Sequence, residues 1–191
     1  MKDRFFYPIA SVVIAAIIGL ALLPGRGNRG LSGAEILAQG YVLSGNNLQH
    51  LTSGPGTLVG FANDEAGMVT HVIASTNLPK NMVAASAGLF GTLGPNYERA
   101  FGGKELKITV RARASGDNPL EQFQAAYFTG GAGSSGWKNF ALTPEYSDYS
   151  FTFTPRKSEG KAGVDYIGIW PGIEGKGQTM DVKFFKVEVA G

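Results

Sequence analysis

Alternation of apolar and polar residues dominates the chain from about residue 41 onward. The longest example is ELKITVRARAS, residues 105–115, in which every second side chain is apolar and the others are polar or charged. A strand that buries one face shows this period of two, whereas an amphipathic helix repeats its apolar positions every three to four residues. The segment therefore predicts a β-strand with one face on a core and Arg111 and Arg113 on the other face.

Further segments show strand character and are separated by turn residues. They are MVTHVIAS (68–75), QFQAAYFTG (122–130), DYSFTFTP (148–155), DYIGIWP (165–171) and TMDVKFFKVEV (179–189). Clusters of glycine, proline, asparagine and aspartate lie between them, and no helical pattern alternates with them. The pattern predicts an all-β, antiparallel sandwich or barrel over residues 41–191. The pair Phe184-Phe185 interrupts the last alternation and predicts a β-bulge.

The N-terminal pattern is different, because no charge interrupts the largely apolar run from Phe5 to Leu23. About 19 helical residues span a hydrocarbon core roughly 30 Å thick. The run is longer than the apolar region of a cleaved secretory signal and ends in LLPG, without an A-x-A sequence. We therefore expect an uncleaved transmembrane signal anchor over residues 1–25. A linker follows over 26–40, with a short helix near Gly33–Ala38.

Small residues recur within the apolar run at intervals of four. Ser11, Ala15 and Gly19 fall on one side of a helix, and such a stripe allows a second helix to approach closely. Two interpretations stay open: an interface with another membrane subunit, or the general abundance of small residues in membrane helices. Basic residues flank both ends of the run, so the composition of the β-domain decides the orientation. We expect residues 5–23 to cross a bacterial inner membrane once, with the C-terminal domain in the periplasm.

Composition narrows the functional classes. The formal net charge of +2 comes without a basic arm or stripe, so a nucleic-acid partner is not expected. Cysteine is absent and the histidines number two, which argues against thiolate sites and histidine-rich metal centres. GAGSSG (131–136) matches G-x-G-x-x-G, but no helical pattern follows it, so we interpret it as a turn rather than a dinucleotide site. We expect neither a metal nor a cofactor.

A catalytic function has little support in the residues. His71 is most simply a histidine packed in a core strand, and His50 lies in a polar segment. Glycoside cleavage requires two carboxylates roughly 5–10 Å apart across a sugar. Four acidic residues are available: Asp165, Glu98, Glu121 and Glu174. Their spacing singles out no pair, so we predict a protein that is not an enzyme, and a small hydrolase stays a weaker alternative.

Aromatic and planar polar residues indicate a carbohydrate-binding face instead. Flat rings stack on the C–H faces of pyranoses, while amide and guanidinium groups bind hydroxyls or carboxylates. In DYIGIWPG, Tyr166 and Trp170 share one face of the predicted strand, with a gap between them at Gly168. The predicted ligand-binding residues are Trp170, Tyr166, Trp137, Arg111, Arg113, Gln124 and Tyr127. The alternative stays open that the rings cap the core or lie under a loop and that the arginines form a solvated face.

Three segments are similar, in pattern and order, to those of jelly-roll carbohydrate-binding modules, a group of galactose-binding-like β-sandwiches. They are GGKELKITVRARAS (102–115), WKNFALTPEYSDYSFTFTP (137–155) and TMDVKFFKVEV (179–189). The resemblance covers roughly Gly40 to Val189 and implies a jelly-roll sandwich that binds a carbohydrate without turning it over. Asp181 stands alone where the family often has two aspartates, which argues against a structural calcium ion at that strand.

These observations lead to two hypotheses. The first is a membrane-anchored, periplasm-facing, non-catalytic module that binds a carbohydrate or an envelope glycan. The second is a structural or accessory subunit of a bacterial membrane-protein complex, with the helix and the sandwich both docked on partner subunits. The aromatic and arginine residues favour the first hypothesis, and the stripe of small residues in the apolar run favours the second.

Overall fold

The computed structural model describes residues 30–84, 87–130, 133–157, 160 and 163–191. Ser32–Gly191 forms one compact unit. The anchor expected over residues 1–25, with its stripe of Ser11, Ala15 and Gly19, lies outside the described residues. No helix in the described ranges combines the length and apolarity that a bilayer crossing requires.

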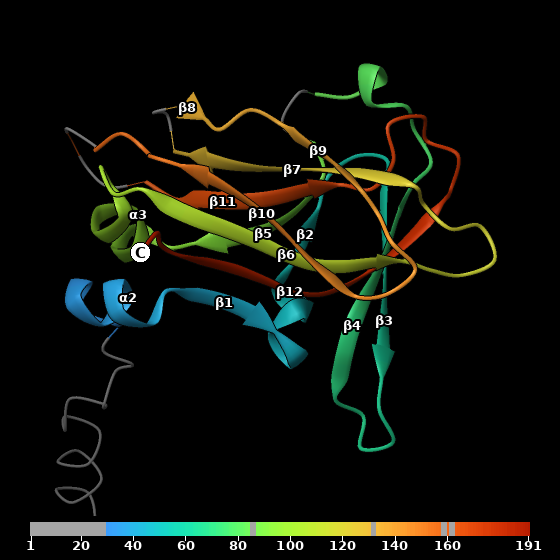
Figure 1. Ribbon diagram of the computed structural model, residues 1–191, viewed down its shortest axis with the longest axis horizontal. Helices are drawn as coiled ribbons and strands as arrows, with labels where there is room; N and C mark the ends of the chain where they lie inside the picture. The colour runs from blue at the N-terminus through green and yellow to red at the C-terminus, as the bar shows by residue number, and fades with distance from the viewer. Residues whose placement is uncertain (1–29, 85–86, 131–132, 158–159, 161–162) are drawn as a thin grey trace, which may run out of the picture. The chain divides into compact units, whose positions relative to one another are not determined.

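Two antiparallel sheets form a β-sandwich (Figure 1). Sheet A has the order β10 (Ser147–Phe153), β6 (Leu106–Ala114), β12 (Thr179–Val189), β4 (Val69–Thr76), β3 (Thr57–Asn63), and β1 (Tyr41–Ser44) also pairs with β12. Sheet B has the order β2 (Thr52–Ser53), β5 (Leu89–Leu93), β11 (Asp165–Trp170), β7 (Gln122–Thr129), β8 (Gly133–Ser134), and β9 (Lys138–Ala141) also pairs with β7. The predicted all-β sandwich is confirmed.

Among the described residues, one short helix precedes the first strand, and three further helical segments connect strands. They are α2 (Gly33–Gln39), η1 (Gly45–His50), η2 (Lys80–Met82) and α3 (Pro95–Phe101). A capping box starts α2, because Ser32 Oγ accepts from Glu35 N and Glu35 Oε2 accepts from Ser32 N. The helix expected near the end of the linker is therefore present. It buries Ile36 and contacts α3, so the compact unit begins with this helix.

Strand β12 organises sheet A. One edge pairs with β6 along almost its whole length, and the other edge pairs first with β4 and then with β1. The register with β6 shifts between Val182 and Phe184, which makes Lys183 the extra residue of a bulge. The predicted bulge is confirmed, one residue earlier than the Phe184-Phe185 pair. It allows both Val182 and Phe185 to face the core.

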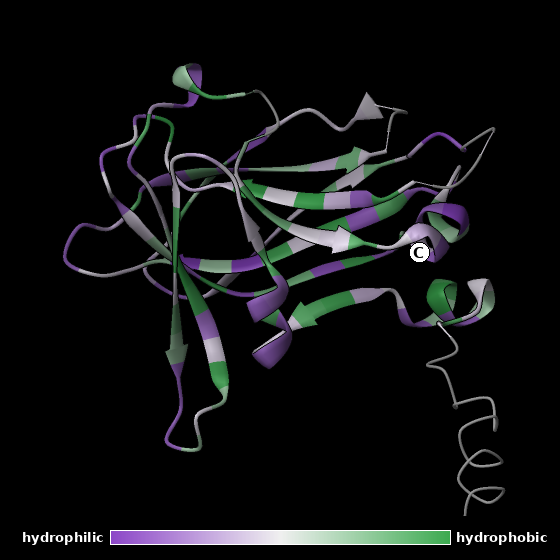
Figure 2. Cartoon of the chain, turned by 180° about the vertical axis from the view of Figure 1, so that it is seen from behind, coloured by the Kyte–Doolittle hydropathy of each residue, from purple (hydrophilic) through white to green (hydrophobic). Residues whose placement is uncertain are grey.

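The core lies between the two sheets and consists of alternate residues of the strands. Fully buried apolar side chains of sheet A are Val72, Ala74, Leu106, Ile108, Val110, Ala112, Met180, Val182, Phe185 and Val187. Those on the inner face of sheet B are Leu89, Leu93, Phe123, Ala125, Tyr127, Ile167 and Ile169. Figure 2 shows the resulting alternation of apolar and polar positions along the strands. Each sheet therefore has an inner face in the core and an outer face on which a ligand site can lie.

Candidate functional site

The outer face of sheet B carries a row of aromatic side chains. Successive residues of a strand point to opposite faces, so the burial of Ile167 and Ile169 leaves Tyr166 on the outer face of β11. Phe128 of β7 stands opposite Tyr166 in register, and Phe90 of β5 stands opposite Gly168. We use the name aromatic row for Tyr166, Phe90, Phe128 and Trp137, the last of which precedes β9.

The four rings contact one another in sequence. The centroid distances are 6.4 Å from Tyr166 to Phe90, 5.9 Å from Phe90 to Phe128, and 5.4 Å from Phe128 to Trp137. All three contacts are edge-to-face, within the range in which aromatic pairs attract. Tyr166 is 38% exposed and the other rings are half-buried. The row is therefore a continuous apolar strip that solvent reaches.

A hollow of about 550 Å³ lies at the Tyr166 end of the aromatic row. Its walls are Phe90, Phe128, Tyr166, Gly130 and the threonines Thr52, Thr92 and Thr129. None of these described lining residues carries a charge. A second hollow, of about 590 Å³, lies beside the loop that follows β6, but its described lining contains no aromatic ring. Of these two hollows, only the first combines flat rings with hydroxyl groups.

The gap expected at Gly168 is filled by the Phe90 ring. A Cβ atom on Gly168 would lie 2.4 Å from Cε1 and 2.6 Å from Cδ1 of Phe90. These separations are far shorter than van der Waals contact, so glycine is needed where the ring lies across the backbone. The sequence had indicated a gap for a ligand at Gly168. In the structure the Phe90 ring, one member of the aromatic row, occupies that position.

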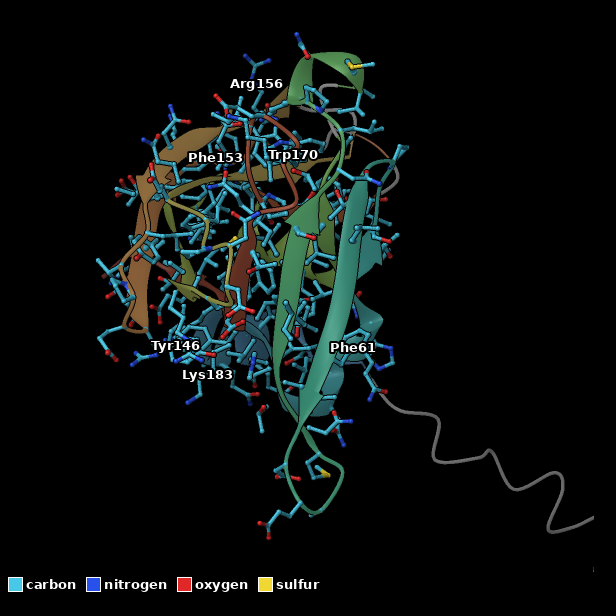
Figure 3. The ribbon with its side chains drawn as sticks, turned by 90° about the vertical axis from the view of Figure 1, so that its right-hand side faces the viewer. Phe61, Tyr146, Phe153, Arg156, Trp170 and Lys183 are labelled. Atoms are coloured by element: carbon cyan, nitrogen blue, oxygen red, sulfur yellow. The ribbon has the colours of Figure 1, made fainter. Side chains whose placement is uncertain are left out.

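Trp170 does not present its ring at the surface. Its position along β11 gives it the same outward direction as Tyr166, yet it is 0% exposed. Figure 3 labels its position. The segment that starts η2 crosses this region: Lys80 N donates to Ile173 O at 2.9 Å, and Lys80 Nζ lies 5.8 Å from the centroid of the Trp170 ring. The prediction of Trp170 as a stacking platform is therefore wrong, because a covering segment buries it.

Tyr127 is also a core residue rather than a ligand contact. It is fully buried on the inner face of β7, and its hydroxyl donates to Asp165 Oδ2 at 2.6 Å. Burial raises the pKa of Tyr127, and burial is also the main reason that the pKa of Asp165 is raised. Glu98 is buried nearby, and its Oε2 has no hydrogen-bond partner among the described residues. Asp165 and Glu98, two of the four acidic candidates, are thus not displayed on an open surface.

The two arginines lie on the other sheet and do not join the aromatic row. Arg111 Nη1 is 3.1 Å from Asp148 Oδ1, and Arg113 Nε is 2.9 Å from Asp181 Oδ2. Their strand, β6, belongs to sheet A, and both side chains lie on its outer face. The grouping of these arginines with the aromatic residues is therefore wrong, because strands that look alike in sequence belong to different sheets.

A polar cluster surrounds Asp181 on this outer face of sheet A. Asp181 is nearly buried and also accepts from Ser115 Oγ at 2.6 Å, and His71 Nε2 lies 3.6 Å away. His71 is half-buried in β4, an interior strand of sheet A, and its Nδ1 lies 2.9 Å from Thr70 Oγ1, so it is a histidine with hydrogen-bonding partners in a strand of the sandwich. The Arg113 guanidinium lies 4.6 Å from the centroid of the Tyr146 ring, which Lys183 also approaches (Figure 3). The cluster is internally paired and fastens the chain before β10 onto the sheet.

Gln124 and Trp137 are the predicted residues that do meet at sheet B. Gln124 Nε2 donates to Asn139 Oδ1 at 2.6 Å, and Gln124 Oε1 accepts from Lys80 Nζ. The same ammonium lies 3.8 Å from the centroid of the Trp137 ring. Burial lowers the pKa of Lys80 to about 8. Tyr166, Trp137 and Gln124 are thus brought to one face.

Sequence reasoning missed three residues of this face: Phe90, Phe128 and Lys80. Phe90 belongs to a strand of only five residues, LFGTL, which carries its own alternation of buried and outward positions. That short pattern is the signal that would have found it. Phe128 adjoins Tyr127, and the choice between the two required knowing which face of β7 meets the core. Nothing in the local sequence indicates that Lys80 reaches β11.

Comparisons with known proteins give a likeness of fold. No protein-family model matches the chain, and no curated protein does. The CBM22-1–GH10 modules of Clostridium thermocellum endo-1,4-β-D-xylanase 10B, complexed with xylohexaose, match with a TM-score of 0.51 and 13% identity, over 80% of this chain and 29% of that chain. The CBM22-1–CBM22-2 tandem domain of Paenibacillus barcinonensis Xyn10C matches with a TM-score of 0.50 and 10% identity, over 74% and 41%.

The chain therefore spans less than half the length of each of these two structures. At 10–13% identity the matches concern the fold, and residue roles do not transfer. The described part of the chain is a β-sandwich similar in structure to CBM22 carbohydrate-binding modules.

Proposed function

We propose that the protein is a non-catalytic carbohydrate-binding module whose ligand lies along the aromatic row of sheet B. The observation that carries the proposal is the row itself, with four rings in edge contact on a solvent-reached sheet face. Rings of this kind stack on the C–H faces of sugars, and the hydroxyls of Thr52 and Thr92 at the adjoining hollow offer hydrogen bonds to sugar hydroxyls.

The shape of the site favours an extended glycan over a single sugar. The rings follow one another from Tyr166 to Trp137 rather than enclosing one point, so successive sugar units meet successive rings. The hollow at the Tyr166 end has a volume of about 550 Å³, which falls within the usual range of roughly 300–1,000 Å³ for ligand sites. The likeness of fold to CBM22 carbohydrate-binding modules supports a glycan as the ligand class; one of the similar structures holds CBM22-1–GH10 modules complexed with xylohexaose.

The apolar run from Phe5 to Leu23 anchors this module in a bacterial inner membrane as a single-pass protein. In this arrangement the sandwich faces the periplasm and meets glycans of the cell envelope. The support for this part of the proposal is the length of the uncharged run, together with the absence of a cleavage sequence at its end.

A second candidate function, an accessory subunit of a membrane complex, has one observation in its favour. The β3–β4 hairpin extends past the rest of the sandwich (Figure 1) and carries exposed apolar side chains, including Phe61 (Figure 3). The others are Leu58, Met68 and Ile73. Leu58 and Ile73 lie on one face of this hairpin and Phe61 on the other. Exposed apolar residues on a protruding hairpin favour a protein contact.

A glycan array probed with the full-length chain in detergent micelles tests the first function. Tyr166→Ala is expected to reduce affinity for the bound glycan at least tenfold, because it removes one ring of the row. Phe61→Ala is the matched control, since Phe61 is an aromatic residue of similar exposure, 42% against 38%, on a different face. Binding by no glycan, or equal losses in both variants, refutes the proposal. Co-purification of a membrane protein that Phe61→Ala abolishes supports the second function.

A further inference from the structure

A lysine stands at the end of the aromatic row. Lys80 lies in the segment between β4 and β5, and the hydrogen bond from its backbone N–H to Ile173 O fixes that segment beside β11. Its ammonium lies 3.8 Å from the centroid of Trp137, the last ring of the row, and 5.8 Å from that of Trp170. A positive charge is thus held against the face on which the proposed glycan lies.

Lys80 has no carboxylate partner among the residues that the structure describes. The cationic side chains that do form ion pairs there are Arg111, Arg113, Lys176, Lys186 and His71. The hydrogen-bond partner of Lys80 is instead Oε1 of Gln124, a neutral amide. An ammonium has three N–H donors, so this bond leaves two, and the ring face of Trp137 lies next to them.

The surroundings of Lys80 make a missing counter-ion costly. A half-buried ammonium loses part of its hydration, and the lowering of its pKa to about 8 has this desolvation as its cause. Aromatic faces and an amide dipole compensate the charge only in part. A carboxylate brought by a ligand would form a charge-assisted hydrogen bond in a partly water-excluded position, where such bonds are stronger than on an open surface.

We infer that the glycan on the aromatic row is acidic and that its carboxylate-bearing sugar lies at the Trp137 end, against Lys80. This inference rests on the proposed function. The sugar ring stacks on Trp137, its carboxylate accepts from Lys80 Nζ, and exposed Asn139 borders the same position. Arg111 and Arg113 do not bind this carboxylate, because both lie on sheet A, where each is already paired with an aspartate.

The experiment compares matched neutral and carboxylated glycans. An array of such pairs includes xylohexaose with its glucuronic-acid-substituted form, and cellohexaose with its C6-oxidised form. The best pair is then titrated by calorimetry against the full-length chain at pH 7 and low salt. The carboxylated member is expected to bind at least tenfold more tightly than the neutral member, and the difference is expected to shrink as salt is added.

Variants of Lys80 assign the preference to this residue. Lys80→Met is expected to remove the preference, so that the carboxylated and neutral members bind with equal affinity. Lys80→Arg keeps the preference, because the charge remains. In the unsubstituted chain, carboxylated ligand is also expected to move the Lys80 pKa up from about 8, measured by NMR of its ammonium group. A purely structural lysine would show no such change.

The outcomes separate this inference from the proposed function. Equal binding of neutral and carboxylated members, or a preference that survives Lys80→Met, overturns the inference and leaves the glycan-binding function standing. Binding to no member of any pair overturns both.

Discussion

The ring of Phe90 lies directly across Gly168, on the neighbouring strand of the same sheet. The two residues stand opposite each other in the β5–β11 ladder, and a single added carbon on Gly168 would come within 2.4 Å of the ring. Phe90 in turn contacts Phe128 and Tyr166. The glycine therefore determines where the central ring of the aromatic row lies, and the continuity of the row depends on it.

Gly168→Ala is expected to break the row by displacing Phe90. Loss of the ring contacts and the strain of an overfilled site together are expected to lower the free energy of unfolding by about 1–3 kcal/mol. Glycan affinity is expected to fall at least tenfold. Denaturant unfolding and calorimetric titration measure both effects.

Gly60→Ala is the control for this substitution. Gly60 also lies in a strand, but a Cβ there would be 3.8 Å from its nearest neighbour, an ordinary contact. It should change neither stability by more than about 0.5 kcal/mol nor affinity. Unchanged affinity in Gly168→Ala would show that glycan binding does not depend on the position of the Phe90 ring above the glycine.

Trp170 and Tyr166 lie on the same strand and are expected to respond in opposite ways. Trp170→Ala leaves a large cavity under the Lys80 segment and is expected to lower the free energy of unfolding by about 3–5 kcal/mol. Tyr166→Ala removes a partly exposed ring and is expected to cost less than about 1 kcal/mol in stability while reducing glycan affinity at least tenfold. Thermal unfolding and titration of both variants provide the comparison. A stable Trp170→Ala that has lost only binding would contradict the assignment of Trp170 as covered.

Periodicity predicted the local features of this fold well. Alternation is a property of neighbouring residues, so it located the sandwich class and the six strands β4, β6, β7, β10, β11 and β12, but not the shorter strands or β3. The interruption at Phe184 predicted the bulge at Lys183. The outward direction of Tyr166 also followed from alternation along β11.

Long-range relations were beyond that pattern. Arg113 and Tyr166 both occupy outward positions on alternating strands, yet β6 and β11 belong to different sheets, so the two side chains lie on opposite outer faces. Periodicity within a strand contains no information on which strands become neighbours. Trp170 likewise points outward, as expected, and only the distant Lys80 segment buries it.

The arginines of sheet A are expected to be irrelevant to glycan binding. Arg111→Ala removes an exposed ion pair with Asp148, which typically contributes no more than about 1 kcal/mol to stability. Because the pair lies on the face opposite the aromatic row, affinity for the glycan should stay within twofold. Calorimetric titration of Arg111→Ala beside Lys80→Met tests the assignment of faces. A tenfold loss in Arg111→Ala would show that the ligand meets sheet A instead.

The buried pair of Tyr127 and Asp165 is expected to make stability depend on pH. Burial, with a smaller contribution from the charge of Glu98, raises the pKa of Asp165 in the folded protein above its value in the unfolded chain. The folded state then binds more protons than the unfolded state between the two pKa values. The contribution of Asp165 to stability is therefore fully present below the unfolded value of about 3.9 and is lost as pH rises through the folded value.

Asp165→Asn is expected to remove this dependence, because asparagine still accepts the hydrogen bond from the Tyr127 hydroxyl but does not titrate. The difference in unfolding free energy between Asp165→Asn and the unsubstituted chain should therefore shift in favour of the variant as pH rises from about 3 to 7. Denaturant unfolding across this range measures it, and subtraction cancels the titration of the other carboxylates. A difference for Asp165→Asn that does not vary with pH would mean that the carboxyl has the same pKa in both states.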